Sequence, residues 1–71
     1  MKKIEIHTEY ITLSQFLKLS GAVLSGGEAK ELIADGEVRI NGEVDTRRGA
    51  KLRGGEIISV CGQEYEVARC S

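Results

Sequence analysis

Basic side chains with no acid among them fill one short stretch of the chain. Residues 46–55, TRRGAKLRGG, contain four cations and three glycines. The cations are Arg47, Arg48, Lys51 and Arg53. Guanidinium groups bind phosphate through a planar fork, and ammonium groups bind it as point charges. The stretch is therefore a candidate contact for a polyanion, and its glycines predict an irregular loop.

A second possible anion site precedes this loop. Ser25 and Glu28 have the spacing of a helix capping box, with Gly26 and Gly27 between them. We expect the free N–H groups of Gly26, Gly27 and Glu28 at the positive end of a helix dipole, where two glycines let a phosphate approach closely. The alternative is that both glycines only ease the turn into the helix.

Two short helices must position these groups. Ala29, Leu32 and Ile33 repeat at helical spacing and Gly36 follows, which predicts a helix over about residues 26–35. The capping pair Thr12 and Gln15 predicts an earlier helix that starts at residue 13 and ends at Gly21. Its apolar face consists of Leu13, Phe16 and Leu17, and we expect it to pack against Leu32 and Ile33.

Strands are predicted on both sides of the helices. Residues 2–7 alternate polar and apolar side chains, which is typical of a half-buried strand. Residues 56–60 and 64–68 indicate a closing hairpin. Val38 and Ile40 alternate with polar neighbours up to the turn pair 41–42. A small antiparallel sheet is the expected result.

The register of the hairpin at Asn41-Gly42 can be predicted from its side chains. A two-residue loop would pair Arg39 with Val44 and put Val44 on the polar face. We therefore favour a three-residue connection that aligns Val44 with Val38 or Ile40.

This order of features resembles the S4 RNA-binding domain, named after a small-subunit ribosomal protein and built around the alpha-L motif. The resemblance covers about residues 12–60, and the run GEVRING after SGGEAKELIAD is its most specific part. It extends to short stand-alone bacterial proteins of the YaaA/YbcJ type. Many S4 domains carry an arginine just after the serine that opens the second helix, where this chain has Gly26. The matching residues are Leu13, Leu17, Gly21, Ser25, Glu28, Ala29, Lys30, Ile33, Gly36, Val38, Ile40, Asn41, Gly42 and Val44.

The resemblance implies an α+β fold, with two short packed helices against a small, mainly antiparallel sheet, in a single domain over residues 1–71. It implies a non-catalytic protein that binds structured RNA, with ribosomal RNA or a ribosomal particle as the expected partner. Arg39 can fork onto phosphate, and Asn41 can reach a base edge or a 2′-hydroxyl or can simply serve the turn. The expected RNA-binding residues are Ser25, Gly26, Gly27, Lys30, Arg39, Asn41, Arg47, Arg48, Lys51 and Arg53.

Composition limits the other possibilities. A net charge of −1 argues against indiscriminate nucleic-acid binding and against a membrane-surface role, and it keeps open a second hypothesis, a protein-interaction module without RNA. Three aromatic residues offer little for base stacking. We expect no enzyme activity, cofactor, metal or small-molecule substrate. The lone His7 has no nearby Ser, Cys or acidic cluster at a spacing it could recruit, and two cysteines, both far from it, are too few for a metal cage.

The N-terminal residues and the cysteines indicate the compartment. MKKIEIHTEY lacks the apolar run of a signal peptide, and a cytoplasmic location is expected. There, Cys61 and Cys70 would stay reduced, Cys61 as a half-buried side chain and Cys70 at a frayed end.

Overall fold

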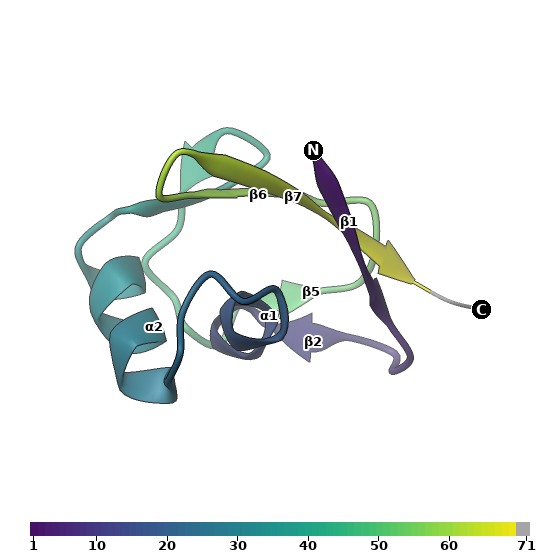
Figure 1. Ribbon diagram of the computed structural model, residues 1–71, viewed down its shortest axis with the longest axis horizontal. Coiled ribbons are helices and arrows are strands. Elements are labelled where there is room, and N and C mark those ends of the chain that lie inside the picture. The colour runs from purple at the N-terminus through teal and green to yellow at the C-terminus, as the bar shows by residue number, and fades with distance from the viewer. Residues whose placement is uncertain (70–71) are drawn as a thin grey trace.

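Two short helices lie on one face of a five-stranded sheet in the computed structural model, which describes residues 1–69 (Figure 1). The chain also forms a separate two-stranded ribbon on the helix side of that sheet. The predicted α+β class is confirmed. The elements are β1 (Lys2–Ile6), β2 (Ile11–Thr12), α1 (Leu13–Leu19), α2 (Gly26–Ala34), β3 (Val38–Ile40), β4 (Glu43–Val44), β5 (Lys51–Leu52), β6 (Ile57–Val60) and β7 (Gln63–Arg69).

The large sheet is mainly antiparallel. Its strand order is β1-β7-β6-β3-β4, and only the β1–β7 pair is parallel among the described strands. The small ribbon pairs β2 with β5, so that Ile11 faces Leu52 and Thr12 faces Lys51. The expectation of an irregular loop over residues 46–55 is therefore wrong in part, because Lys51 and Leu52 form a strand.

Local capping starts both helices at the predicted residues, with a complete capping box in α1 and half of one in α2. Thr12 Oγ1 accepts from the Gln15 N–H at 3.4 Å, and Gln15 Oε1 accepts from the Thr12 N–H at 3.2 Å. Gly21, at φ +82°, follows the end of α1, where a residue with a Cβ atom would be strained. In α2, Ser25 Oγ accepts from the Glu28 N–H at 3.2 Å. The second bond of the expected capping box, from the Ser25 N–H to the Glu28 side chain, is not formed within residues 1–69.

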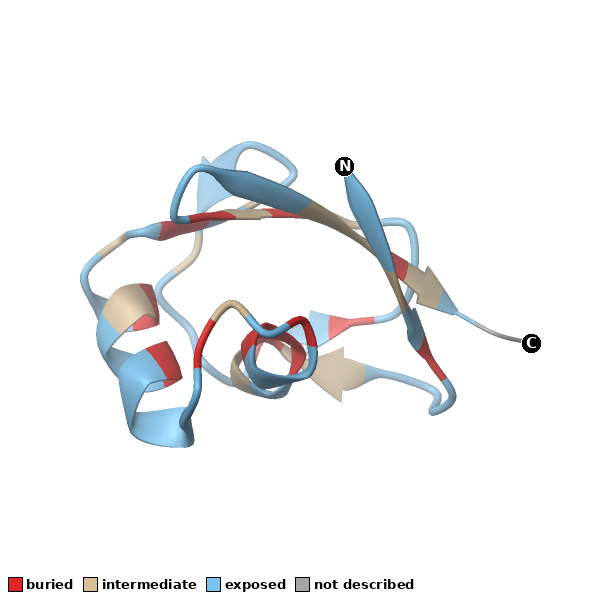
Figure 2. Ribbon diagram, in the orientation of Figure 1, coloured by how far each residue is buried: buried red, intermediate tan, exposed pale blue. Residues whose placement is uncertain are grey.

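The core lies between the large sheet and the layer formed by the helices and the β2–β5 ribbon (Figure 2). Leu13, Phe16 and Leu17 are fully buried, and Ile33 is 1% exposed, so the predicted helix contact is confirmed. Leu32 is partly buried against the same cluster. Alternation sends one face of the central strands β6 and β7 into this core, and the other face of the sheet is uncovered by helices.

The β3–β4 hairpin has the register that we did not favour. Arg39 pairs with Val44 and Ile40 pairs with Glu43, so the loop contains two residues. Asn41 and Gly42 have φ of +52° and +85°, and a two-residue loop with both central φ values positive matches the right-handed twist of the strands. Val44 is consequently 51% exposed, on a strand at the edge of the sheet.

A second two-residue turn joins β6 to β7. Val60 pairs with Gln63, which leaves Cys61 and Gly62 as the loop. Cys61 has φ of +51° and is exposed, so its expected half-buried position is wrong. Cys70 lies outside the described residues. His7 is exposed, as predicted.

Candidate nucleic-acid interface

The basic loop is fixed to the N-terminus of α1 by backbone hydrogen bonds. The N–H of Leu13 donates to the carbonyl of Ala50 at 2.8 Å, and the N–H of Ser14 donates to the carbonyl of Arg48 at 3.2 Å. The first N–H groups of a helix have no partner within it, and here the loop supplies acceptors. Ala50 and Leu52 are 7% and 1% exposed, so apolar contacts hold the same segment. The loop therefore presents its cations from a defined position.

Arg47 is partly neutralised at the start of this loop. Its Nη2 lies 2.7 Å from Asp45 Oδ2, and its Nε donates to Asp45 Oδ1 at 3.1 Å. The same carboxylate accepts from the Arg47 backbone N–H at 2.8 Å. These hydrogen bonds lower the pKa of Asp45 and raise that of Arg47. The Arg47 side chain nevertheless remains 77% exposed, so its outer edge is open to solvent.

Lys51 and Arg53 occupy the other end of the loop, beside Tyr10. Lys51 Nζ lies 4.9 Å from the centre of the Tyr10 ring, and Arg53 Cζ lies 5.8 Å from it. Arg53 also approaches Glu9, with Nη1 to Oε1 at 3.8 Å. Both partners of that pair are more than half exposed, so the contact is weak.

Glu56 orders the end of the loop, a role that the sequence analysis missed. Its two carboxylate oxygens accept from the backbone N–H groups of Arg53 at 2.9 Å and Gly54 at 2.7 Å. The signal is present in the sequence, because an acid two or three residues after an irregular segment can bind its free N–H groups.

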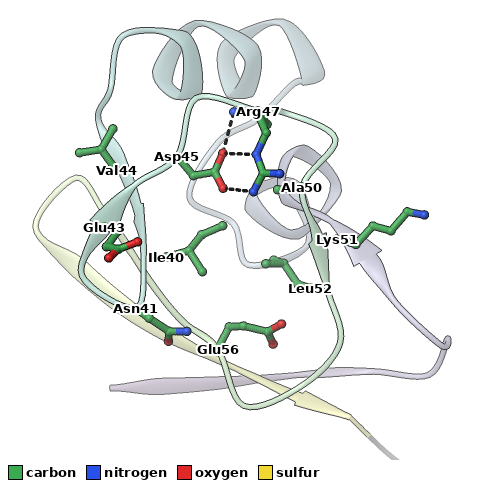
Figure 3. A pocket seen from close by; sticks show the side chains of 10 residues that line it. All are labelled: Ile40, Asn41, Glu43, Val44, Asp45, Arg47, Ala50, Lys51, Leu52 and Glu56. Atoms are coloured by element: carbon green, nitrogen blue, oxygen red, sulfur yellow. Dashed lines mark hydrogen bonds and ion pairs between the residues drawn. The ribbon is translucent and has the colours of Figure 1, made fainter.

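A cavity of about 280 Å³ separates the loop from the β3–β4 hairpin (Figure 3). The carboxylates of Glu43, Asp45 and Glu56 border it, while the Lys51 side chain points away from it. The acids therefore gather on the inner side of the loop. A polyanion meets fewer like charges if it approaches the loop from outside.

The N-terminus of α2 offers two unpaired donors within the described part of the chain. The N–H of Glu28 donates to Ser25 Oγ, contrary to our expectation that this group is free. The N–H groups of Gly26 and Gly27 have no acceptor among the described residues. A Cβ atom at Gly26 would meet nothing within 4 Å, and one at Gly27 would meet only Ser25 Oγ at 4.0 Å. Packing within this chain therefore does not require either glycine.

Comparisons with known proteins identify the family of the chain. The family model described as the S4 domain matches residues 4–68. The chain belongs to the S4 domain family. A probable ribosome maturation protein, RlbA from Bacillus subtilis (strain 168), is 49% identical over 59 residues, covering 83% of each chain. YbcJ from Escherichia coli (strain K12) is 38% identical over 58 residues, covering 82% of this chain and 83% of YbcJ.

Solved structures show the same fold. The solution structure of E. coli YbcJ, described as revealing an alpha-L motif involved in RNA binding, matches with a TM-score of 0.74 and 33% identity over 96% of this chain and 87% of that one. The 30S ribosomal protein S4e of Thermoplasma acidophilum matches with a TM-score of 0.63 and 22% identity over 83% of this chain and 31% of that one. The second match shows the fold alone.

This S4 domain does not bring all of the expected residues together. Segment 45–49 lies beside α2, the helix that carries the exposed Lys30, in both Figure 1 and Figure 3. Arg39 is on the other face of the sheet, because its neighbours Val38 and Ile40 point into the core. Its cross-strand partners there are Ser59 on β6 and Val44 on β4. Arg39 therefore stands apart from the basic loop.

Asn41 of the S4 domain has a structural role. Its Oδ1 accepts from the Ile57 N–H at 2.9 Å, and its own N–H donates to the Ile57 carbonyl at 2.8 Å. These two bonds tie the hairpin turn to the start of β6. The turn interpretation of Asn41 is thus supported, and only the amide nitrogen of its side chain remains for an outside partner.

No helix among residues 1–69 of this S4 domain has the length and apolar character needed to cross a membrane. Within the same residues, no group of three or more His, Cys, Asp or Glu is arranged to hold a metal ion.

Proposed function

We propose that this S4-domain protein is a non-catalytic RNA-binding protein that recognises structured RNA in the cytoplasm, with ribosomal RNA or a ribosomal particle as its partner. The main contacts are the outer side of the basic loop and the N-terminus of α2. The similarity to proteins named for ribosome maturation and for an RNA-binding motif supports this proposal.

The anchoring of the basic loop is the observation that carries the proposal. Two hydrogen bonds to the start of α1 and the burial of Ala50 and Leu52 hold the segment in place. Arg48 and Lys51 make no ion pair with any described residue, so their charges are available. A rigid display of cations binds a folded RNA with a smaller entropic cost than a mobile loop does.

The α2 N-terminus adds a directional contact. The free N–H groups of Gly26 and Gly27 point along the helix axis, where the dipole favours a phosphate oxygen. A Cβ atom at Gly26 would meet nothing within 4 Å, so packing among the described residues does not require a glycine there. Close approach of an RNA backbone accounts for the glycine at this position.

A titration of structured RNA at several salt concentrations tests the proposal. Each phosphate neutralised adds roughly −0.7 to −0.9 to the slope of log affinity against log salt concentration. Reversal of Arg47, Arg48, Lys51 and Arg53 to Glu should abolish binding while the fold remains, as judged by its NMR spectrum. Unchanged affinity in this variant would refute the proposed function.

A protein-interaction module on the same fold is the second candidate. The ion pair between Arg47 and Asp45 favours it, because one of the four loop cations already has an anionic partner. Purification of the protein from cells after nuclease treatment separates the two candidates. Partner proteins that stay bound without RNA support an interaction module, whereas their release together with the RNA supports RNA binding.

A further inference from the structure

Tyr10 is an exposed aromatic residue that the proposed contacts do not use. It precedes β2, and the centre of its ring lies 4.9 Å from Lys51 Nζ and 5.8 Å from Arg53 Cζ, both in the basic loop. The residue is 40% exposed. Thr8 Oγ1 donates to the Tyr10 carbonyl at 2.7 Å, and the β2–β5 ladder begins at the next residue. The ring is therefore held on an ordered turn.

A shallow groove of about 530 Å³ runs from Tyr10 to the outer side of α1. Tyr10, Ile11 and Leu19 give it an apolar surface, and Leu19 is 54% exposed. Tyr10 and Leu19 line the same groove, and each keeps 40% or more of its surface exposed to solvent. Together they form a surface against which a flat apolar group can pack.

Positive charge surrounds this groove. Lys18 lines it, and Lys51 and Arg53 stand at its Tyr10 end. One acid, Glu9, approaches these cations, with its carboxylate 3.8 Å from Arg53 Nη1. A flat ring attached to an anion fits such a surface, whereas a purely apolar peptide would leave the cations unmatched.

We infer that the groove between Tyr10 and Leu19 binds an unpaired nucleobase of the RNA, while Lys51 and Arg53 contact the phosphate of the same nucleotide. The inference rests on the proposed function and extends it, because it adds recognition of a single-stranded position to contacts that are otherwise made to the backbone. Bases stack on aromatic side chains in a manner that tolerates different sequences. It also revises the expectation that this chain has little to offer for stacking.

The site is separate from the N-terminus of α2. In Figure 1, α1 lies between α2 and the β2–β5 ribbon that adjoins Tyr10. The basic loop runs from one helix region to the other, since segment 45–49 lies beside α2 in Figure 1 and Figure 3 and Lys51 adjoins Tyr10. An RNA that spans both would place paired nucleotides over the loop and an unpaired nucleotide in the groove.

Two probes distinguish this inference from simple charge attraction. One is an RNA hairpin with an unpaired uridine extension, and the other is the same hairpin with blunt ends. Tyr10→Ala should weaken binding of the extended hairpin about 5- to 100-fold, the range of one stacked base, and should leave the blunt hairpin nearly unchanged. Tyr10→Phe keeps the ring and is the matched control, expected to bind both probes as the unmodified protein does.

Leu19→Ala supplies a second variant at the far end of the groove, in case Tyr10→Ala alters the turn. It should lower affinity for the extended hairpin alone. NMR spectra of each variant check the fold, and the resonances of Tyr10 and Leu19 should shift on addition of the extended hairpin. Equal binding by Tyr10→Ala and Tyr10→Phe, or equal losses with both probes, would overturn the inference while leaving RNA binding intact. If the unmodified protein binds neither probe, the proposed function itself fails.

Discussion

The guanidinium of Arg47 and the carboxylate of Asp45 meet in a two-point contact, with Nη2 to Oδ2 at 2.7 Å and Nε to Oδ1 at 3.1 Å. Asp45 is 14% exposed at its side chain, so the acid is largely covered while the base faces solvent. The contact orients the start of the basic loop, and the Asp45 carboxylate neutralises part of the positive charge of Arg47. The same pair therefore stabilises the loop and weakens its attraction for a polyanion.

The stability of the protein should depend on the ionisation of Asp45. Hydrogen bonds from Arg47 lower the pKa of Asp45 in the folded protein below its value in the unfolded chain. The resulting stabilisation is present above the unfolded pKa and is lost as the pH falls through the folded one. Melting temperatures of the protein and of Asp45→Asn should therefore differ at pH 6, and the difference should shrink progressively as the pH falls below about 4. A difference that stays constant from pH 6 to pH 2.5 would contradict this assignment.

Asn41 should stabilise the hairpin through both its side chain and its backbone conformation. Asn41→Ala removes the bond to the Ile57 N–H. It also places an alanine at φ +52°, a left-handed conformation that asparagine adopts more readily because its polar side chain can form local hydrogen bonds. We expect a loss of about 1–2 kcal/mol in the free energy of unfolding, measured by urea titration. Asn41→Gly tolerates the conformation and should lose less, and Asn41→Asp keeps the acceptor. An alanine variant as stable as the parent would show that the bond contributes nothing.

Leu17 should be far more sensitive to truncation than an exposed leucine nearby. Leu17 is fully buried between the helices and the sheet, whereas Leu24 is 91% exposed. Leu17→Ala is expected to cost about 2–5 kcal/mol in the free energy of unfolding. Leu24→Ala is the matched control, with a change of no more than about 0.5 kcal/mol. Similar values for the two variants would mean that the core is wrongly placed.

Gly26→Ala should separate folding from RNA binding. The added Cβ atom meets nothing within 4 Å, so stability should stay constant or rise by up to about 1 kcal/mol. If a phosphate rests on the α2 N-terminus, the methyl group obstructs it and affinity for structured RNA should fall about two- to fivefold. Fluorescence anisotropy measures the affinity. A variant that gains stability and keeps full affinity removes the α2 N-terminus from the interface.

Both helices could be predicted from the sequence because their ends are set by local chemistry. Thr12 and Ser25 accept the first N–H groups, and Gly21 and Gly36 adopt positive φ just beyond the helices. These interactions span only three or four residues, so the sequence pattern suffices to locate them.

The sheet register could not be predicted in the same way. Our choice for the hairpin assumed that Val44 needs burial, but β4 is an edge strand and turn geometry at Asn41-Gly42 determined the pairing. The β2–β5 ladder and the parallel β1–β7 pair join segments far apart in the chain, which alternation alone does not reveal.

The candidate site was predictable in composition but not in arrangement. Strand alternation already indicated that Arg39 lies opposite Val38 and Ile40, and that signal could have separated Arg39 from the loop cations. Glu56 bonds N–H groups only two and three residues away, so a local signal could have located it, whereas the position of Tyr10 beside the loop depends on chain folding over longer distances. The contact between Tyr10 and Lys51 joins residues far apart in the chain, so the sequence pattern alone does not reveal it.

A pair of double charge reversals tests the central claim most directly. Arg48→Glu with Lys51→Glu changes the basic loop, and Lys3→Glu with Arg39→Glu makes the same change in net charge on the outer face of the sheet. Titration of both variants with structured RNA at one salt concentration compares the two faces. We predict that the loop variant loses most of its affinity, at least tenfold or about 1.4 kcal/mol, and that the sheet variant binds nearly as the parent does. Equal losses in the two variants would contradict an RNA interface centred on the loop.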